Sequence, residues 1–236
     1  MNIENFGYVI VTDYVKANTG EDVSDAIQKI INENPHRTIY FPDGEYILSK
    51  PICTPANPAN AVSLELSKFA TLKASPDWTE KEAIVRLGAA EPFNNIRVNG
   101  SNYGIFGGII DGSGVAKGIS IDSGRETLIE KVSIKNTFVG IHIKHGANSN
   151  SSDADVLNVN IVGNGKPESI GVLIEGHDNT LTNMRIAAVQ TGVIAFEEGS
   201  EIVGELLKGY DNRTFVTENN TFDLTTNVAV ITEAFE

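Results

Sequence analysis

GISID (118–122), GIHIK (140–144), GVLIE (171–175) and GVIAF (192–196) are four segments of this chain that open in the same way. They begin 22, 31 and 21 residues apart. The longest interval contains HGANSNSSDAD (145–155), whose Asn, Ser, Gly and Asp content predicts an inserted loop. Removing about nine residues restores the period, so the second half of the chain is predicted to be a stack of similar units.

Each unit contains a second apolar run that alternates with period two or stays apolar over a few residues, as β-strands do. These runs are TLIEKVSIKN (127–136), ADVLNVNIVGN (154–164), NTLTNMRIAAV (179–189) and SEIVGELLKGY (200–210). The Leu/Asn template of a leucine-rich horseshoe is absent. A repeated strand–turn–strand unit of this length indicates one coil of a right-handed, single-stranded parallel β-helix, an all-β fold whose coils bury apolar side chains by stacking.

The first half of the chain fits the same fold with less regular spacing. Its short apolar strands are expected in TIYFPDGEYILSKPI (38–52), VSLELSKFATLKAS (62–75), AIVRLG (83–88), NIRVNG (95–100) and YGIFGGIIDGSG (103–114). Together with the second half, they predict a single β-helical domain over residues 1–236.

A short helix is expected ahead of these strands, over residues 22–34. Its apolar residues have helical spacing and are Val23, Ala26, Ile27, Ile30 and Ile31. Asp22 is the expected N-cap, and Pro35 ends the helix. An amphipathic helix at this place would cover the open end of the stack, where strand edges and apolar core would otherwise be exposed.

Alternation within the repeated segments predicts which side chains point into the β-helix. The inward set, in two stacks, is Ile119, Ile121, Ile141, Ile143, Val172, Ile174, Val193 and Ala195. With that register, Asp122, Lys144 and Glu175 form one outward column of alternating charge. His142 lies in the neighbouring outward column, between Ser120 and Leu173.

Composition restricts the partners. The formal net charge is −13, which repels phosphate backbones and makes a nucleic-acid partner unexpected. No apolar run approaches the roughly 20 residues that a membrane span needs. No signal peptide is visible at the N-terminus, so a cytoplasmic, phage-associated or surface-associated location is left open. The single cysteine, Cys53, is expected to be a small buried apolar residue rather than a reactive thiol.

The segment from Thr12 to Ile52 resembles the N-terminal signature of the pectate-lyase-like superfamily. The matching pieces are Ala26–Gln28 in the expected helix and YFPDGEY (40–46), and residues 62–75 and 107–114 resemble later elements in the right order. That superfamily includes polygalacturonases, related lyases, C5-epimerases and bacteriophage tailspikes. The resemblance implies the fold and a carbohydrate ligand, and it leaves the reaction open, because one fold hosts many activities.

Polygalacturonase chemistry is disfavoured by the residues at the matching positions. In that family, aspartates stand just before the Gly-Ile or Cys-Ile that opens a strand. The pairs at those positions here are Phe138–Val139, Ser169–Ile170 and Gln190–Thr191, and none is acidic. Only two isolated sites, His145–Gly146 and His177, approach the family's His-Gly element.

The candidate catalytic or binding residues are therefore the outward groups His142, Lys144, Glu175 and Asp122. A carboxylate, an amine and an imidazole on one ledge can bind or process a sugar. A surface ladder of alternating charges is the structural alternative, and a register shift by one residue would exchange inside and outside.

Other polar groups have weaker support. No cofactor is expected. The alternative is calcium at Asp153 and Asp155 with Asn148 and Asn150, but their spacing matches no calcium loop. Asp111 is expected in a tight turn. The arginines at 125, 185 and 213 are expected to be solvated surface charges.

Two functions follow from the sequence. One is a carbohydrate-active lyase, hydrolase or epimerase acting on a polysaccharide or oligosaccharide. The other is a non-catalytic carbohydrate-binding or structural module, such as a tailspike-like or adhesin piece. The tailspike resemblance also suggests a homo-oligomer, a trimer in particular.

Overall fold

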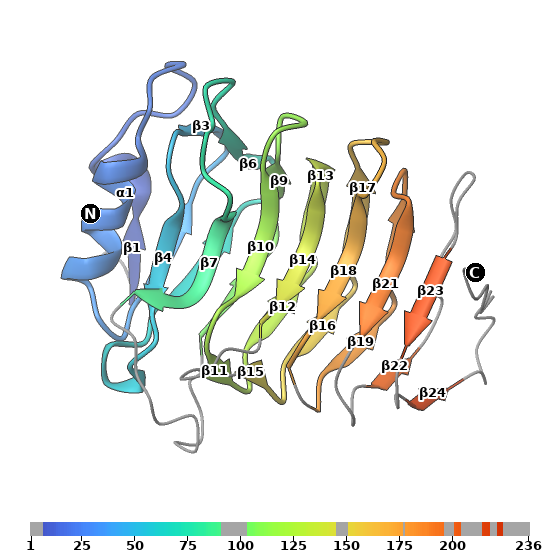
Figure 1. Cartoon of the computed structure of the whole chain (residues 1–236). Helices are drawn as coiled ribbons and strands as arrows, with labels where there is room; N and C mark the ends of the chain where they lie inside the picture. Colours follow the sequence, from blue (N-terminus) through green and yellow to red (C-terminus); the bar gives the residue numbers. More distant parts are fainter. Residues whose placement is uncertain are drawn as a thin grey trace.

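In the computed structural model, the described part of the chain comprises residues 7–90, 103–144, 151–176, 178–195, 201–203, 214–217 and 221–223. It winds as a parallel β-helix whose coils stack along one axis, as Figure 1 shows. Every pairing between described strands is parallel and joins a strand to the corresponding strand of the next coil. The predicted fold class is confirmed.

The described strands form three long sheets, here called sheets A, B and C. Sheet A contains, in spatial order, β1 (Tyr8–Ile10), β2 (Thr38–Phe41), β5 (Ser63–Leu66), β8 (Gly104–Phe106), β12 (Leu128–Glu130), β16 (Asp155–Leu157), β19 (Thr180–Thr182), β22 (Glu201–Val203) and β24 (Thr221–Asp223). Sheet B contains β3 (Gly44–Leu48), β6 (Ala70–Ala74), β9 (Ile109–Asp111), β13 (Ser133–Thr137), β17 (Asn160–Gly163) and β20 (Arg185–Ala187).

Sheet C contains β4 (Ile52–Pro55), β7 (Ala83–Ala90), β10 (Lys117–Ile121), β14 (Val139–Ile143), β18 (Ile170–Ile174), β21 (Thr191–Ala195) and β23 (Thr214–Thr217). A two-stranded sheet joins β11 (Gly124–Arg125) to β15 (Ser151–Ser152). Two short 3₁₀ helices, η1 (Val11–Asp13) and η2 (Pro58–Asn60), lie in the N-terminal coils. The expected strand at 95–100 lies outside the described residues.

The repeat unit has three main strands where the sequence predicted two. The first three predicted second runs each contain a sheet-A strand and a sheet-B strand, separated by a sharp corner; of the fourth run only the sheet-A strand β22 lies in the described part. The residue that begins the corner is Lys131 in the first run, Asn158 in the second and Asn183 in the third, and each has φ between 53° and 57°. A single residue in the left-handed conformation turns the chain without the Gly/Pro punctuation that marks longer turns, and asparagine tolerates this conformation well. The sequence therefore shows one apolar run where the structure has two strands and a corner.

The predicted inserted loop at 145–155 is wrong at its C-terminal end. Residues 145–150 lie outside the described part, but Ser151–Ser152 form strand β15 and Asp155 begins β16. Ser151 is fully buried, and its hydroxyl donates to the Ile121 carbonyl oxygen at 2.8 Å. Polar composition indicated a loop, whereas these residues satisfy their hydrogen bonds within the neighbouring coil.

Stacked aliphatic side chains form the core, in the predicted register. Ile119, Ile141, Val172 and Val193 pair in succession across sheet C, and all are fully buried. Ile121, Ile143 and Ile174 form the second stack and are also fully buried. Ala195 continues this pairing, but its side chain lies outside the described part. The predicted division between inward and outward faces is therefore confirmed.

The glycine that opens each repeat is required by the close approach of successive coils. A methyl group added to Gly140 would lie 2.5 Å from the carbonyl oxygen of Gly171 and 2.7 Å from a methyl carbon of Ile161. Gly118 and Gly171 face the next glycine carbonyl in the same way. Any larger residue would push the coils apart, which explains why the repeated segments begin with glycine.

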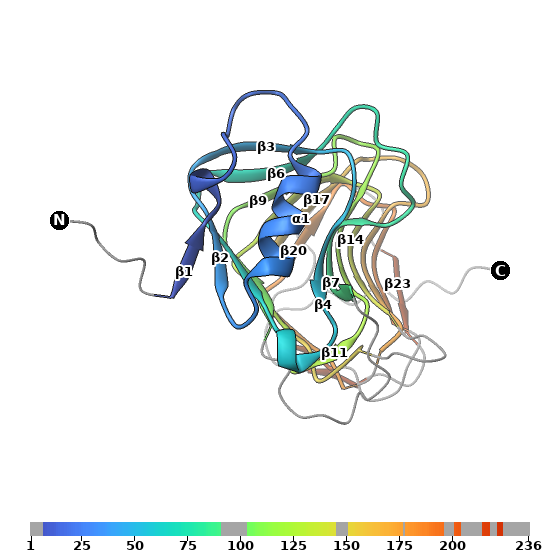
Figure 2. The ribbon, with the colours of Figure 1, turned by 90° about the vertical axis from the view of Figure 1, so that its left-hand side faces the viewer.

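Helix α1 (Ser24–Glu33) lies across the first coils and covers the N-terminal end of the stack, as Figure 2 shows. Ile27, Ile30 and Ile31 are buried beneath it. Two details of the sequence prediction are wrong. Ala26 is exposed, because the helix turns the face bearing Ser24 and Ile27 toward the stack.

The helix also begins two residues later than predicted, so Asp22 is not its N-cap. The Asp22 carboxylate instead accepts hydrogen bonds from the Ser24 and Ser49 backbone N–H groups, each at 3.0 Å, and thus ties the helix start to the end of β3. No helix in the described part is long and apolar enough to cross a membrane.

Gln28 protects the exposed edge of sheet C. Its side-chain amide donates to the Cys53 carbonyl oxygen at 2.9 Å and accepts from the Cys53 N–H at 2.7 Å. Cys53 lies in β4, the outermost strand of the sheet, so the amide occupies the place of a further strand. Cys53 itself is half-buried rather than buried, and burial raises the pKa of its thiol.

Candidate functional site

The predicted site residues lie on the outer face of sheet C, where its strands end. Asp122, Lys144 and Glu175 each directly follow the last residue of β10, β14 and β18. His142 pairs with Ser120 on one side and with Leu173 on the other. The two predicted outward columns are therefore present, and the structure supplies the contacts within them.

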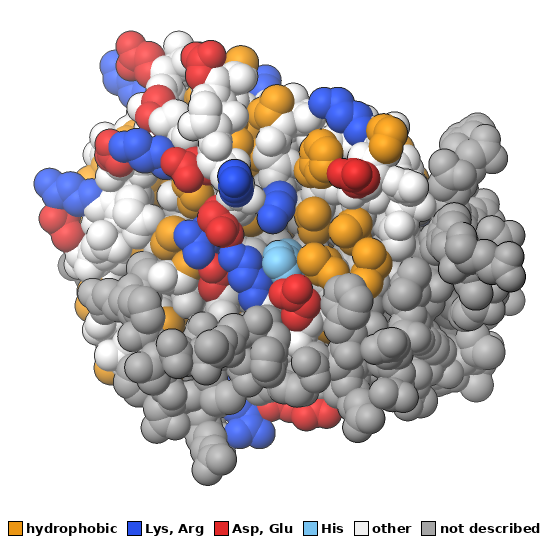
Figure 3. All heavy atoms as spheres, viewed as in Figure 1, with side chains coloured by type: hydrophobic (Ala, Val, Ile, Leu, Met, Phe, Trp, Pro, Cys, Tyr) orange, Lys and Arg blue, Asp and Glu red, His pale blue; other side chains and the backbone are white. Residues whose placement is uncertain are grey.

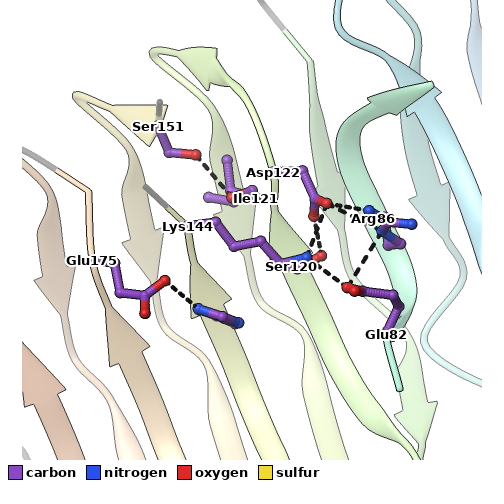
Figure 4. A network of polar contacts seen from close by, with 9 residues as sticks. Glu82, Arg86, Ser120, Ile121, Asp122, Lys144, Ser151 and Glu175 are labelled. Atoms are coloured by element: carbon purple, nitrogen blue, oxygen red, sulfur yellow. Dashed lines mark hydrogen bonds and ion pairs between the residues drawn. The ribbon is translucent and has the colours of Figure 1, made fainter. Parts of the chain in front are cut away.

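Four charged side chains form a connected group, here called the ionic cluster: Glu82, Arg86, Asp122 and Lys144. Asp122 Oδ2 accepts from Arg86 Nη2 at 2.5 Å and from Lys144 Nζ at 3.0 Å. Lys144 Nζ also donates to Glu82 Oε2 at 2.5 Å, and Arg86 Nε lies 3.8 Å from the same oxygen. Figure 4 shows these contacts converging from β7, β10 and β14.

The predicted charge ladder is thus only half correct. Asp122 and Lys144 are paired, but Lys144 turns toward Glu82, and Glu175 bonds to His142. The sequence prediction considered only neighbours in the regular repeat, whereas Glu82 comes from the less regular first half of the chain.

The ionic cluster is not an exposed surface ladder. The Asp122 side chain is only 12% exposed, and Glu82 is the most accessible member at 38%. Burial by itself would raise the pKa of Asp122, but hydrogen bonds from Arg86 and Ser120 and the charge of Lys144 outweigh it and hold that pKa below its ordinary range. The hydrogen bond from Lys144 likewise lowers the pKa of Glu82. Both carboxyl groups are therefore ionised at neutral pH.

Replacement of Asp122 by asparagine tests the energetic role of this cluster. The variant leaves Arg86 and Lys144 to share Glu82, so unfolding should become easier by about 1.5–3 kcal/mol at pH 7, the range for hydrogen bonds to charged groups. Because the folded-state pKa of Asp122 is lowered, its contribution is present above the ordinary value of 3.8 and is lost as pH falls through the folded-state pKa. Urea unfolding of both proteins from pH 7 to about pH 2 should therefore show a difference that closes only below the ordinary value of 3.8.

Asp25→Asn is the matched control for that experiment. Asp25 pairs with Lys50 at 3.0 Å, but its side chain is largely exposed. Its loss should cost about 0–1 kcal/mol, as for surface ion pairs. Equal effects of the two substitutions would contradict a structural role for the ionic cluster.

His142 and Glu175 form a second polar unit, here called the His142–Glu175 pair. Their Nε2 and Oε2 atoms lie 2.8 Å apart. Burial lowers the pKa of His142, although the Glu175 carboxylate opposes this effect. The imidazole is therefore neutral at pH 7, with Nε2 donating to the carboxylate. The other ring nitrogen, Nδ1, is buried and has no hydrogen-bond partner among the described residues.

The accessible member of this pair is Glu175. Its side chain is 37% exposed, whereas that of His142 is 13% exposed. An approaching ligand can thus meet the second carboxylate oxygen of Glu175, while His142 orients that carboxylate from beneath. The sequence prediction placed both on one exposed ledge, whereas in the structure the Glu175 side chain is the more exposed and the His142 side chain is largely covered.

An apolar area borders this pair. Leu173 and Ile194 continue the column of His142 along the face and are half-buried. Figure 3 shows hydrophobic side chains gathered beside the patch of charged side chains on this face. The outer face of sheet C therefore offers hydrogen-bonding groups next to an aliphatic surface.

A family profile described as "Rhamnogalacturonase A/epimerase, pectate lyase-like" matches residues 8–214. The chain belongs to this family. The comparison with curated protein sequences finds no significant match.

Solved structures with the same fold share little sequence with this rhamnogalacturonase A/epimerase-like chain. A tailspike protein of the E. coli bacteriophage HK620, solved with a pentasaccharide, has a TM-score of 0.60 at 13% identity, over 92% of this chain and 50% of its own. A putative glycosyl hydrolase from Parabacteroides merdae has a TM-score of 0.55 at 16% identity, over 94% and 95%. The Streptococcus pneumoniae surface protein and adhesin PfbA has a TM-score of 0.58 at 14% identity, over 88% and 61%.

This family member thus spans only about half to three-fifths of the tailspike and the adhesin, but nearly all of the putative hydrolase. At such identities the likeness concerns the fold.

The residues considered for calcium are not gathered into a site in the described part of this family member. Asp153 pairs with Arg125, with Oδ2 2.6 Å from Nε. Asp155 lies exposed at the start of β16, and Asn148 and Asn150 are outside the described residues. Among the described side chains, no group of three His, Cys, Asp or Glu is arranged to hold a metal ion.

The other polar residues singled out from the sequence have local roles where they are described. Asp111 closes a turn, accepting from the Ser113 N–H at 2.9 Å and from the Asn136 side chain at 3.0 Å. Arg125 is not a solvated charge as predicted, because it pairs with Asp153. Arg185 is exposed, as expected. Arg213, His145 and His177 lie outside the described part.

Sequence reasoning missed Glu82 and Arg86. Arg86 aligns with Ser120 in the neighbouring strand, 34 residues later in the chain. That separation departs from the 22-residue period, so the repeat alone could not align the two coils. The sequence did contain a signal for Arg86 as a candidate site residue, because it is the one charged residue within the apolar run AIVRLG (83–88).

Proposed function

We propose that this chain is a carbohydrate-active β-helix protein that contacts a polysaccharide or oligosaccharide on the outer face of sheet C. One observation carries this proposal: the partly exposed carboxylate of Glu175, held by His142, borders the aliphatic surface of Leu173 and Ile194. A sugar ring has polar hydroxyl groups at its rim and apolar C–H groups on its faces. A carboxylate beside aliphatic side chains is complementary to both, as binding sites generally combine apolar surface with a few placed polar groups.

Family membership and the named relatives support a sugar ligand. The family description names a rhamnogalacturonase and an epimerase, and the tailspike was solved with a pentasaccharide. The surface adhesin has the same fold, which supports a non-catalytic binding module as the alternative function. We further propose that the chain associates as a trimer, which light scattering at several protein concentrations would test.

Among the three reactions considered, hydrolysis fits the ionic cluster least well. An inverting hydrolase needs one protonated carboxylic acid and one carboxylate base. Asp122 and Glu82 both have lowered pKa values, so neither is suited to be the acid. Proton transfer at a sugar carbon, as in a lyase or an epimerase, needs a base instead. In that case Glu175 is the candidate base, with His142 as its positioning residue, and the substrate has to be a uronate, because the sugar's carboxyl group acidifies the neighbouring C–H.

Binding measurements on Glu175→Gln and His142→Ala test the proposal. Each change should weaken binding of an oligosaccharide identified on a glycan array by about tenfold to a hundredfold, the equivalent of one hydrogen bond to a charged group. Isothermal titration calorimetry gives the affinity, and a thermal melt run alongside reports folding. Glu21→Gln is the control, since it removes an exposed carboxylate in the segment just before helix α1, which covers the N-terminal end of the stack.

For an enzyme, the same oligosaccharide is then assayed for reducing ends and for the absorbance of unsaturated uronate. Lyase activity appears in the second assay, hydrolysis in the first alone, and a binding module is silent in both. Unchanged affinity in both variants would overturn the assignment of the ligand to this face.

A further inference from the structure

We propose that the outer face of sheet C selects an uncharged sugar over a uronate, and that Glu82 and Asp122 are the residues that set this preference. This inference rests on the proposed function, since it concerns the ligand of the same face. It goes beyond that function by naming the chemical class of the sugar. An uncharged sugar favours the binding module over a lyase or an epimerase, because elimination and C5 epimerisation both need a uronate.

The cations of the ionic cluster are already neutralised from within the protein. Arg86 donates to Asp122 through Nη2 at 2.5 Å and through Nε at 3.1 Å. Lys144 contacts both carboxylates, Glu82 at 2.5 Å and Asp122 at 3.0 Å. A uronate would have to displace a carboxylate that is held in place by the fold. Such an exchange gains little binding free energy, because one carboxylate–cation pair is broken for each one that is formed.

The rest of the face adds no net positive charge. Among the described residues, the cations whose charges act on His142 or Glu82 are Arg86, Lys117 and Lys144, and the carboxylates beside them are Glu82, Asp122 and Glu175. With His142 neutral, these three positive and three negative charges cancel. Lys117, at the start of β10, makes no ion pair with a described carboxylate.

The whole chain reinforces this local balance. Its formal net charge of −13 creates a negative field that repels an acidic polymer during approach. The group best placed to contact a ligand, Glu175, can only accept hydrogen bonds when ionised. It therefore suits sugar hydroxyl groups and repels a sugar carboxylate.

Glu82 offers a clean test, because it is the most exposed member of the ionic cluster and lies just before β7. Glu82→Gln removes one negative charge and leaves Asp122 as the remaining carboxylate for both Arg86 and Lys144. The face then carries a net positive charge. We expect this variant to gain affinity for a uronate by about tenfold or more, since the new contact is a charge-assisted hydrogen bond.

The ligands for this test form a matched pair. The first is the neutral oligosaccharide that binds the unaltered protein best on a glycan array carrying neutral and uronate-containing sugars. The second is the same oligosaccharide oxidised at C6 to the uronate. Calorimetric titration should show that the unaltered protein prefers the neutral sugar by about tenfold or more. Glu82→Gln should reduce or reverse that preference, whereas Glu21→Gln, with the same change in net charge, should leave it unaltered.

Each outcome bears on a different part of the argument. If a uronate-containing sugar is the best ligand of the unaltered protein, this inference is overturned while the proposed function stands. If Glu82→Gln leaves the preference unchanged, Glu82 does not set the selectivity. If no sugar on the array binds, the proposed function fails and the inference fails with it.

Discussion

Ile27→Asp is expected to abolish soluble, folded protein. Ile27 is fully buried between helix α1 and the first coils of the stack. An aspartate there would place an ionised carboxylate against an aliphatic core with no described cation positioned to pair with it. Burying an unpaired charge costs far more than the few kcal/mol by which a typical domain is stable, so the helix would detach. The apolar end of the β-helix and its strand edges would then be free to pair with other chains.

Ala26→Asp is the matched control, because the neighbouring side chain is exposed. This substitution should give soluble protein with the oligomeric state of the unaltered chain and a nearly unchanged melting temperature. Size-exclusion chromatography of the soluble fraction, followed by circular dichroism, distinguishes the two variants. Soluble, folded Ile27→Asp protein with the oligomeric state of the unaltered chain would show that the helix does not protect the end of the stack.

The contrast between these two residues illustrates how far the sequence could predict the fold. Alternation in GIHIK and its relatives predicted the inward residues correctly, because a strand has a strict two-residue period and each coil repeats its neighbour. The helical stripe included Ala26, because alanine is compatible with either a buried or an exposed position. Only the contact with the coils decides which flank of the helix is covered.

The corner between sheets A and B was missed for a different reason. Asn158 and Asn183 turn the chain by adopting a left-handed conformation, and the Asn183 side chain donates to that of Asn158 at 3.1 Å. Asparagine is equally common in ordinary turns and at strand ends, so its sequence position alone does not indicate a corner. Three-strand coils become apparent only when the pairing of successive coils is known.

The candidate site was predicted in its register but not in its contacts. His142 and Glu175 come from neighbouring coils of the regular repeat, so their proximity followed from the period. The contact between Lys144 and Glu82 did not follow from the period, because Glu82 lies 62 residues earlier in the chain, in its less regular half. The burial of these side chains was not predicted either, because the sequence indicates that a side chain points outward but not whether neighbouring side chains cover it.

Ile143→Ala should lower the free energy of unfolding by about 4 kcal/mol, within the range of about 2–5 kcal/mol for removing a buried isoleucine side chain. Ile143 is fully buried, with Ile121 and Ile174 as its neighbours in the stack. Backbone hydrogen bonds hold these coils at a spacing of about 4.8 Å, so they cannot move together to fill the space. The lost side chain should therefore leave a cavity, and the cost should lie in the upper part of the range.

Val162→Ala is the control for this truncation, because Val162 lies in β17 with its side chain 44% exposed on the outer face of sheet B. Removing its methyl groups should change stability by no more than about 0.5 kcal/mol, as for most surface substitutions. Urea unfolding of both variants, monitored by circular dichroism, supplies the comparison. A cost below about 1 kcal/mol for Ile143→Ala would mean that the coils can close around the missing side chain. That result would contradict a rigid stack, and with it the argument that outward residues such as Glu175 are held in fixed positions by the sheet beneath them.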